Sequence, residues 1–494
     1  MNWAFLLPQR EAGQTIQSAL RQSIVGAIGD GRLASGQQMP PSRALAEQMG
    51  VARNTVIAVY EELVARGYLV STERRGYFVE GNASQLAVNE RAVNENDAGP
   101  APRAQTDWTE RFAITPAAWR NISKPTNWQD YRYPFIYGQV DPELFPIAVW
   151  RACSRDALGR SAVNYWAADH AVNDDPLLIE QICRQILPQH GVFARPEEVL
   201  ITLGSQHGLY LLSQLLVRPG EWVGIEDPGY TDARNIFSLS RGKVRSVPVD
   251  ESGLRLGPWL DKLGYLVVTP AHQCPTMVTM PNDRRQALLD WARASDAILI
   301  EDDYEGETRF EAAMPALKSL DRDGRVIYLG TLSKLLAPGV RIGFMVAPAA
   351  VIREARALRR LMHRSAPLNN QRTAAIFLAE GHCQGLVRTL RNALKDRWEA
   401  ICAAVAVHLP DFQRSPSIGG SSIWLTCPPD IDPVDLLETA AKRGVLFEPG
   451  EPFYATPPSS GHLRLGFSSI PASRISDGVR ALADAVSDLR KQRH

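Results

Sequence analysis

The sequence has 494 residues, with 54 Lys and Arg against 54 Asp and Glu, and 45% of its residues are hydrophobic. This amount of apolar material excludes a largely disordered chain, and the length allows two to four domains. The formal net charge of zero argues against a uniformly basic nucleic-acid coat protein. A local DNA-binding module remains compatible with it, because charge acts through its distribution.

Six scattered cysteines form no C-x-x-C pair and no zinc-type cluster with histidine. The sequence therefore predicts free thiols in a reducing compartment and no metal site. The first residues lack the basic region and the length of a signal peptide, and no apolar run approaches the ~20 residues that span a bilayer. We expect a cytoplasmic protein that does not contact a membrane.

The first 80 residues have the pattern of a small helical domain. Apolar residues at helical spacing predict a helix over 14–28. A helix-turn-helix follows, in which Ser42 is the predicted N-cap and Gly50 supplies the tight turn. The second helix of this pair is predicted over 53–65, with apolar residues along one face.

The exposed ends of this domain carry side chains suited to DNA. The N-terminal turn of the second helix presents Arg53, Asn54 and Thr55, which are residue types that bind phosphates and base edges. Residues 67–80 predict two short strands around a turn that contains Arg75 and Gly76, and this hairpin is a wing. The domain has eight Arg, seven acidic residues and no Lys, so the DNA-binding charge must be concentrated on one face.

Residues 81–106 are rich in Asn, Ala, Gly and Pro and poor in large apolar side chains. Such a segment buries too little surface to offset the entropy of ordering, so we predict a flexible linker. The predicted organisation is a DNA-binding domain over 1–80, the linker over 81–106, and a large domain over 107–494.

In the large domain, strands and helices alternate from about residue 198 onward. This pattern is typical of an α/β fold whose mostly parallel sheet is covered by helices on both faces. Ligands of such sheets bind at the carboxyl ends of the strands. The apolar runs that predict strands cover 198–204, 221–228, 265–270, 297–303 and 326–331.

Lys334 follows one of these strands directly, within Thr331-Leu332-Ser333-Lys334. Burial and nearby cations lower the pKa of a lysine and favour the free amine that forms a Schiff base. The strand-to-helix junction Gly204-Ser205-Gln206 predicts a phosphate cradle, to which Ser333 and Arg341 could add a hydroxyl and a guanidinium.

Two further strand ends carry side chains suited to a flat ring. Glu301-Asp302-Asp303-Tyr304 offers a carboxylate for a protonated pyridine nitrogen, and the residues alone do not decide between Asp302 and Asp303. Tyr230 lies at a strand end, where its ring could stack on a flat ring of a ligand, although core packing would also explain this tyrosine.

Together these residues resemble a fold type I site for pyridoxal 5'-phosphate (PLP), similar to that of the class I aminotransferases. Residues 137–146 (YGQVDPELFP) resemble the opening motif of that fold, and residues 461–467 (GHLRLGF) resemble its C-terminal stretch. The first 80 residues resemble the winged helix of the GntR superfamily. The whole chain therefore resembles the MocR subfamily of bacterial transcription regulators.

The resemblance implies a role for each matched residue. Lys334 forms the internal aldimine, Asp302 pairs with the pyridine nitrogen, Tyr304 bonds the ring oxygen, and Tyr230 stacks on the ring. The predicted phosphate-binding residues are Ser205, Gln206, Ser333 and Arg341, Arg464 binds the effector, and the DNA-binding residues are Arg43, Arg53, Asn54, Thr55, Arg75 and Gly76.

The chain departs from the aminotransferase pattern at Cys274, which stands where an asparagine usually contacts the ring oxygen. His272 or Gln273 could take over that contact. Met277 replaces a usual glycine, so the loop is expected to be reshaped. Asp232 stands where some relatives carry an arginine, and an acid there would favour an amine over a second carboxylate.

The resemblance implies a PLP-dependent regulator that senses an amino compound, or PLP itself, through aldimine chemistry at Lys334 and controls metabolic or transport genes. The alternative is an active aminotransferase with an accessory DNA-binding head. Fold type I proteins are usually dimers, so a homodimer is expected.

Overall fold

The computed structural model of the chain describes residues 3, 6, 15–72, 75–81, 107–168, 173–306, 309–310 and 314–492. The chain divides into two compact units, Met1–Ile114 and Thr115–His494. The predicted linker lies, apart from its first residue, outside the described residues, so its extent stays a prediction.

The described residues of the N-terminal unit form three α-helices and a two-stranded wing. Helix α3 has the predicted bounds, and its buried residues are the apolar face expected from the sequence. The wing strands pair in antiparallel fashion. The elements are α1 (Ile16–Gly29), α2 (Ser42–Met49), α3 (Arg53–Ala65), β1 (Leu69–Thr72) and β2 (Gly76–Val79).

The prediction that Ser42 caps α2 is wrong by one position. The N-cap is Pro41, Ser42 is the first helical residue, and no side chain caps this helix end. Pro41 has a ψ of 137°, which is not helical, so the helix begins one residue later at Ser42. The Ser42 hydroxyl instead accepts a hydrogen bond from Arg53 Nε at 3.3 Å. Gly50 has the left-handed conformation (φ 65°) that the turn requires.

The larger unit contains an eight-stranded sheet in the order β4-β11-β10-β9-β8-β5-β6-β7. Neighbouring strands from β10 to β6 run parallel, whereas β11 and β7 are antiparallel to their neighbours. The strands are β4 (Val199–Thr202), β5 (Trp222–Asp227), β6 (Lys243–Asp250), β7 (Gly253–Leu254), β8 (Leu263–Val268), β9 (Ile298–Asp303), β10 (Val326–Thr331) and β11 (Gly343–Val346).

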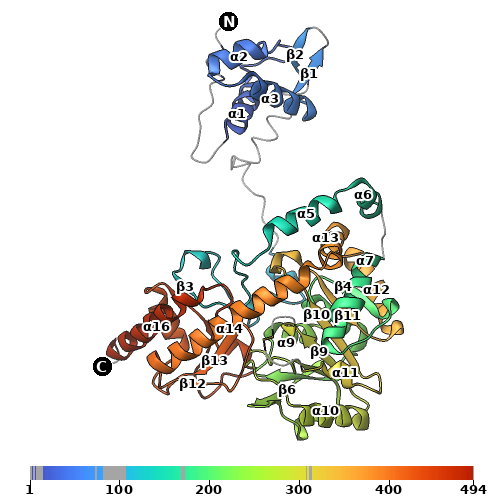
Figure 1. Cartoon of the computed structure of the whole chain (residues 1–494), viewed down its shortest axis with the longest axis vertical. Helices are drawn as coiled ribbons and strands as arrows, with labels where there is room; N and C mark the ends of the chain where they lie inside the picture. Colours follow the sequence, from blue (N-terminus) through green and yellow to red (C-terminus); the bar gives the residue numbers. More distant parts are fainter. Residues whose placement is uncertain are drawn as a thin grey trace. The chain divides into compact units, whose positions relative to one another are not determined.

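Helices cover both faces of this sheet, as the apolar strands predict. One face packs against α8, α9 and α12, and the other packs against α7, α10, α11 and α13. Helix α5 packs on α13, and α6 follows α5 (Figure 1). These helices are α5 (Ile147–Ala157), α6 (Arg160–Trp166), α7 (Pro176–Gln181), α8 (Ser205–Leu216), α9 (Thr231–Leu239), α10 (Asn282–Ser295), α11 (Leu317–Leu320), α12 (Ala349–His363) and α13 (Leu368–Ala379).

A smaller four-stranded sheet, β12-β13-β16-β15, has its own core with three helices. Helix α14 runs from the end of α13 to this part, where it packs against α16 (Figure 1). The elements are β12 (Gln413–Arg414), β13 (Ser422–Thr426), β15 (Glu448–Pro449), β16 (His462–Gly466), α14 (His382–His408), α15 (Pro433–Ala441) and α16 (Ala472–Gln492), with the strand pair β3 (Tyr133–Pro134) and β14 (Val445–Leu446) beside them. No helix in the described part is long and apolar enough to cross a membrane.

Candidate functional site

A cavity of about 360 Å³ opens where the carboxyl ends of β4, β5, β8, β9 and β10 meet the smaller sheet. It is lined by every residue that the sequence predicts for the cofactor and the effector. The predicted residues along it are Ser205, Gln206, Tyr230, Asp302, Tyr304, Ser333, Lys334, Arg341 and Arg464. The cavity lies at the position that the rule for α/β sheets predicts.

Lys334 lies just after β10, and its Nζ atom is 4.0 Å from the centre of the Tyr137 ring. Burial lowers the pKa of Lys334 to about 8, and the neighbouring charges of Lys124 and Arg464 act in the same direction. Glu305 opposes this shift. With this pKa, about a tenth of the lysine is free amine at pH 7, far more than with the ordinary value of 10.5.

Asp302 and Asp303 point to different surroundings. Asp302 lines the cavity beside Ser205, whose hydroxyl favours the charged form of this carboxyl. Asp303 Oδ2 instead accepts a hydrogen bond from Tyr328 at 2.9 Å and lies 3.3 Å from His190 Nδ1. Of the two carboxylates, Asp302 is therefore the one that can reach a cofactor.

Burial raises the pKa of Asp302 to about 7, and the neighbouring charge of Asp303 adds to this shift. Although burial also disfavours charge on Asp303, its hydrogen bonds and the charge of His190 hold the pKa of that carboxyl below its usual value. A buried acid with a raised pKa is stabilised as a carboxylate by a cation, which a protonated pyridine nitrogen would supply.

The predicted phosphate residues surround the N-terminus of α8. Gly204, the N-cap of this helix, has a φ of 86°, and a Cβ atom there would lie 3.3 Å from an Arg341 Nη atom. Arg341 Nη2 donates to the Leu203 carbonyl at 2.5 Å. Ser333 Nα donates to Thr331 Oγ1 at 3.1 Å. The glycine thus allows a guanidinium to approach the helix end closely.

Tyr230 is held in place through Asp232. The Tyr230 hydroxyl donates to Asp232 Oδ2 at 3.0 Å, and Gln206 Nε2 donates to the same oxygen at 3.1 Å. Gln206 therefore contacts Asp232 with its side chain, and only its position at the start of α8 fits the predicted phosphate role.

The structure brings neither His272 nor Gln273 into the cavity, so the expectation that one of them replaces the missing asparagine is not met. Gln273 Nε2 bonds the carbonyls of Pro228 and Cys274, and both side chains are buried. Cys274 itself lines the cavity, together with Thr269, whose hydroxyl accepts a hydrogen bond from the Cys274 amide at 3.0 Å. Met277 adopts a positive φ of 62°, the conformation that makes glycine usual there.

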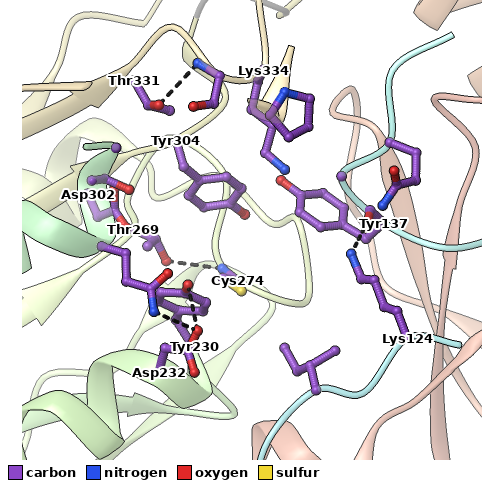
Figure 2. A pocket seen from close by; sticks show the side chains of 18 of the residues that line it. Lys124, Tyr137, Tyr230, Asp232, Thr269, Cys274, Asp302, Tyr304, Thr331 and Lys334 are labelled. Atoms are coloured by element: carbon purple, nitrogen blue, oxygen red, sulfur yellow. Dashed lines mark hydrogen bonds between the residues drawn. The ribbon is translucent and has the colours of Figure 1, made fainter. Parts of the chain in front are cut away.

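The sequence did not single out Lys124 and Glu448, which lie at the effector end. Arg464 Nε donates to Glu448 Oε2 at 2.7 Å, and Lys124 Nζ lies 3.5 Å from Glu448 Oε1. Figure 2 shows Lys124 and Asp302 on opposite sides of the cavity, with the neighbouring rings of Tyr137 and Tyr304 between them. Lys124 belongs to an irregular segment without periodicity, so no local signal marked it.

The side chains fit pyridoxal 5'-phosphate at both ends of the cavity. Several buried polar atoms of the described residues have no hydrogen-bond partner, Asp303 Oδ1 among them, and Asp302 Oδ1 and Ser333 Oγ are the two whose residues line the cavity. Buried polar atoms are nearly always paired, so these two oxygens indicate a missing polar group near each. A pyridinium would satisfy the first oxygen, and a phosphate the second.

In the N-terminal unit, Arg43, Arg53, Asn54, Arg75 and Gly76 are exposed, and Thr55 is half-buried. The Arg53–Ser42 hydrogen bond makes the N-terminal turns of α2 and α3 neighbours. Gln38 Nε2 donates to the Arg75 carbonyl at 2.7 Å, which ties the wing turn to the segment leading into α2. By contrast, Arg21 and Arg66 both pair with Glu62.

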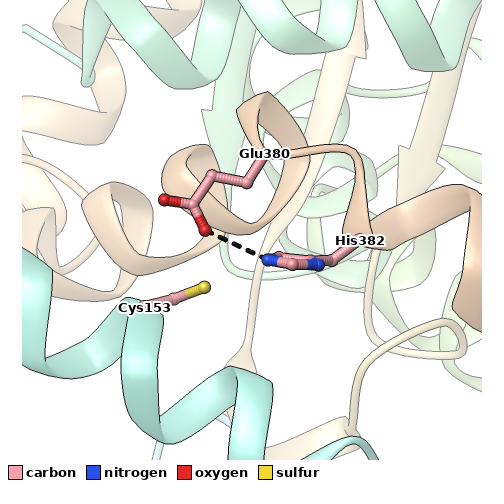
Figure 3. A group of neighbouring side chains, drawn as sticks. All are labelled: Cys153, Glu380 and His382. Atoms are coloured by element: carbon pink, nitrogen blue, oxygen red, sulfur yellow. Dashed lines mark hydrogen bonds and ion pairs between the residues drawn. The ribbon is translucent and has the colours of Figure 1, made fainter.

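Cys153, Glu380 and His382 form a separate group of possible metal-binding side chains between α5 and the start of α14 (Figure 3). His382 Nε2 lies 3.0 Å from Glu380 Oε2, so a hydrogen bond already joins these two side chains. Burial and the charge of Glu380 raise the pKa of the Cys153 thiol, and a protonated thiol is a poor metal ligand. The group is therefore a hydrogen-bonded histidine and glutamate beside a core cysteine.

Two family models match the chain. The model described as "Bacterial regulatory proteins, gntR family" matches residues 14–79, and "Aminotransferase class I and II" matches residues 161–482. Among solved structures, a kynurenine aminotransferase from Pyrococcus horikoshii is 28% identical with a TM-score of 0.69, covering 77% of this chain and 98% of that one. The α-aminoadipate aminotransferase LysN from Thermus thermophilus is 27% identical with a TM-score of 0.70, covering 78% and 99%.

Curated relatives match both units together. The HTH-type transcriptional regulator TauR of Rhodobacter capsulatus is 41% identical over 98% of each chain. The probable rhizopine catabolism regulatory protein MocR of Rhizobium meliloti is 30% identical over 97% of this chain and 95% of its own. The large unit thus has the fold type I aminotransferase-like fold, and the fold class predicted from the sequence is confirmed. The chain belongs to the MocR-like regulators of the GntR family, in which a helix-turn-helix DNA-binding domain is joined to an aminotransferase-like domain.

Proposed function

We propose that this chain is a cytoplasmic, homodimeric transcription regulator that binds pyridoxal 5'-phosphate at Lys334 and senses an amino compound there. The observation that carries the proposal is one cavity that combines Lys334, its pKa lowered to about 8, with the unsatisfied oxygens of Asp302 and Ser333. The chain that contains it also belongs to a family of regulators.

When bound, the cofactor would supply an aldehyde carbon that can condense reversibly, with loss of water, with a primary amine such as that of Lys334 or of the effector. In our proposal, Asp302 holds the proton of the pyridine nitrogen, and Tyr304 donates to the ring oxygen. Tyr230 packs on the ring, held by Asp232. Arg464 contacts the effector. Ser205, Gln206, Ser333 and Arg341 hold the phosphate.

The proposed domains have the limits predicted from the sequence, which are 1–80, 81–106 and 107–494.

Effector binding changes the preferred conformation of the large domain and thereby the placement of two DNA-binding heads on an operator. The regulated genes would encode metabolism or transport of the effector.

The lowered pKa of Lys334 predicts how cofactor binding depends on pH. Free amine reacts, and its fraction rises as pH increases through the pKa of about 8, instead of through the ordinary value of 10.5. The rate at which apo-protein gains visible absorbance from added cofactor should therefore rise up to about pH 8 and level off above it. A rate that keeps rising up to about pH 10 would contradict the environment assigned to Lys334.

The role of the recognition helix is tested with Arg53→Ala. The substitution removes a cation at the exposed N-terminus of α3, so binding to a fragment upstream of the gene itself or of a neighbouring gene should weaken by roughly tenfold or more. Arg66→Ala is the matched control, because Arg66 caps the other end of α3 and pairs with Glu62. Equal affinities of the two variants in a gel-retardation titration would refute the assignment.

The second candidate function is an active aminotransferase with an accessory head. The set of Lys334, Asp302 and Arg464 in one cavity favours it, as does the similarity to solved aminotransferases. Cys274 in place of the usual asparagine argues for poor turnover. Multiple-turnover assays with amino acids and 2-oxo acids separate the two, since sustained turnover at rates typical of aminotransferases would establish the enzyme.

A further inference from the structure

Three cationic side chains gather around the ring of Tyr137. Lys334 Nζ lies 4.0 Å from the ring centre, the Arg464 guanidinium carbon 4.2 Å, and Lys124 Nζ 5.9 Å. The proposed function gives Lys334 and Arg464 a role. Lys124 has none, although it lines the same cavity.

The ammonium groups of Lys124 and Lys334 converge on one point of the backbone. A Cβ atom added to Gly138 would lie 2.7 Å from Lys334 Nζ and 3.6 Å from Lys124 Nζ. Lys124 Nζ also donates a short hydrogen bond to the carbonyl oxygen of Tyr137. Its side chain is 31% exposed and is therefore accessible from the cavity.

At the effector end of the cavity, the basic side chains of Lys124 and Arg464 lie against one carboxylate, that of Glu448. Glu448 is shared, with Oε2 at 2.7 Å from Arg464 Nε and Oε1 at 3.5 Å from Lys124 Nζ. Oε1 is buried and has no hydrogen-bond partner among the described residues. Burial lowers the pKa of Lys124, and Glu448 opposes this shift more strongly than Arg464 adds to it. One carboxylate is nevertheless divided between two basic side chains.

We propose that Lys124 determines specificity by binding, together with Arg464, the anionic group of the effector. This rests on the proposed function, in which the amine of the same effector reacts at the Lys334 end. The effector is then a small amino acid with a carboxylate or a sulfonate, because a plain amine would leave the excess charge unmatched. Its amine and acid are only a few bonds apart, since both lysines lie close to Gly138.

The contacts of Asp232 argue against the expectation that this residue selects a plain amine as the effector. Both Tyr230 and Gln206 donate to its Oδ2 atom, so these neighbours already offset its charge. Figure 2 shows Asp232 on the opposite side of the cavity from Lys124.

Lys124 also lies on the stretch of chain that leads back to the predicted linker. Next to it in sequence, Arg120 Nη1 donates to the Tyr454 carbonyl at 2.9 Å, and Asn235 Nδ2 donates to the Arg120 carbonyl at 3.0 Å. This segment therefore contacts α9 of the larger sheet and the loop before β16 of the smaller one. An effector held by Lys124 would bind directly to the chain that continues toward the DNA-binding head.

The test compares amino acids with amines that lack the acidic group, using the full-length protein loaded with cofactor. The pairs are glycine with methylamine, β-alanine with ethylamine, and 2-aminoethanesulfonate with ethylamine, so that carboxylates and sulfonates are separate arms. The change in visible absorbance gives a half-saturating concentration for each compound. The acid-to-amine ratio is taken within each variant, so that a general loss of folding or loading cancels.

In the wild type, at least one acid should saturate at a lower concentration than its matched amine. Lys124→Met should reduce that preference by about tenfold or more, because it removes a charged hydrogen-bond donor. Lys124→Arg should retain most of the preference. Lys243→Met makes the same substitution at an exposed lysine beside Trp222, outside the cavity lining, and should leave the ratio unchanged.

Loaded wild type that responds to no acid, or to acids and amines equally, overturns this inference alone. The same holds if the ratio for Lys124→Met equals that of the wild type. Wild-type protein that never gains visible absorbance from the cofactor overturns the proposed function, and the inference fails with it.

Discussion

Replacing Lys334 with alanine is expected to abolish the visible absorbance that wild-type protein gains from pyridoxal 5'-phosphate. The absorbance depends on a carbon–nitrogen double bond between the cofactor and an amine. Lys334 is the lysine at the end of β10, and its lowered pKa makes its amine available. Alanine removes the amine and leaves the backbone of this turn unchanged.

Lys395→Ala is the matched control, because this lysine lies on α14 with its side chain 58% exposed. It should keep the full absorbance. Borohydride reduction of the loaded wild type, followed by peptide mass spectrometry, should place the cofactor on the peptide that contains Lys334. Full absorbance in Lys334→Ala would mean that another amine carries the cofactor, and Lys124 would be the first candidate because it lines the same cavity.

Much of the fold could be predicted because its signals are local. The bounds of α3 and of β10 agree with the sequence prediction, since each element has a periodic or continuous apolar pattern with a clear end. The place of the cavity followed from topology, because the carboxyl ends of parallel strands meet at one edge.

The choice between Asp302 and Asp303 could not be predicted in the same way. Consecutive residues of a strand point to opposite faces, and β9 is covered by helices on both, so its sequence does not indicate which face opens to the cavity. Asp302 lies on the side of Ser205 at the start of α8, whereas Asp303 points to Tyr328 and His190. His190 is far away in the sequence, so only the folded chain reveals this pairing.

Lys124 and Glu448 were missed for a related reason. Lys124 lies in an irregular segment, and its partner Glu448 is 324 positions further along the chain. Neither residue belongs to a motif, and a single charged residue in a loop is usually only solvated. Their place in the candidate site depends on contacts between distant parts of the chain. Glu448 contacts Arg464 and Lys124 contacts Tyr137, and no local sequence pattern encodes these contacts.

The assignment of Asp302 predicts a large and selective loss of cofactor affinity in Asp302→Asn. The amide has nearly the same size, but it carries no charge to hold the proton of the pyridine nitrogen. Removing one partner of a buried charged hydrogen bond costs about 2–5 kcal/mol, so the Kd for the cofactor should rise by roughly 30-fold or more. The measurement is a titration of apo-protein followed by absorbance. Unfolding of the variant should remain close to that of the wild type, because Asp302 Oδ1 has no hydrogen-bond partner in the described chain.

Asp303→Asn makes the identical substitution one residue later, and the opposite result is expected. Asp303 bonds Tyr328 and lies 3.3 Å from His190, so loss of its charge should cost about 1–3 kcal/mol of folding free energy. A lower thermal midpoint with nearly normal cofactor affinity would separate this carboxylate from Asp302. If Asp303→Asn weakened the cofactor as much as Asp302→Asn did, the pyridine partner would have been assigned to the wrong residue. The two variants together therefore test whether the face of β9 that meets α8 is the face that binds the ring.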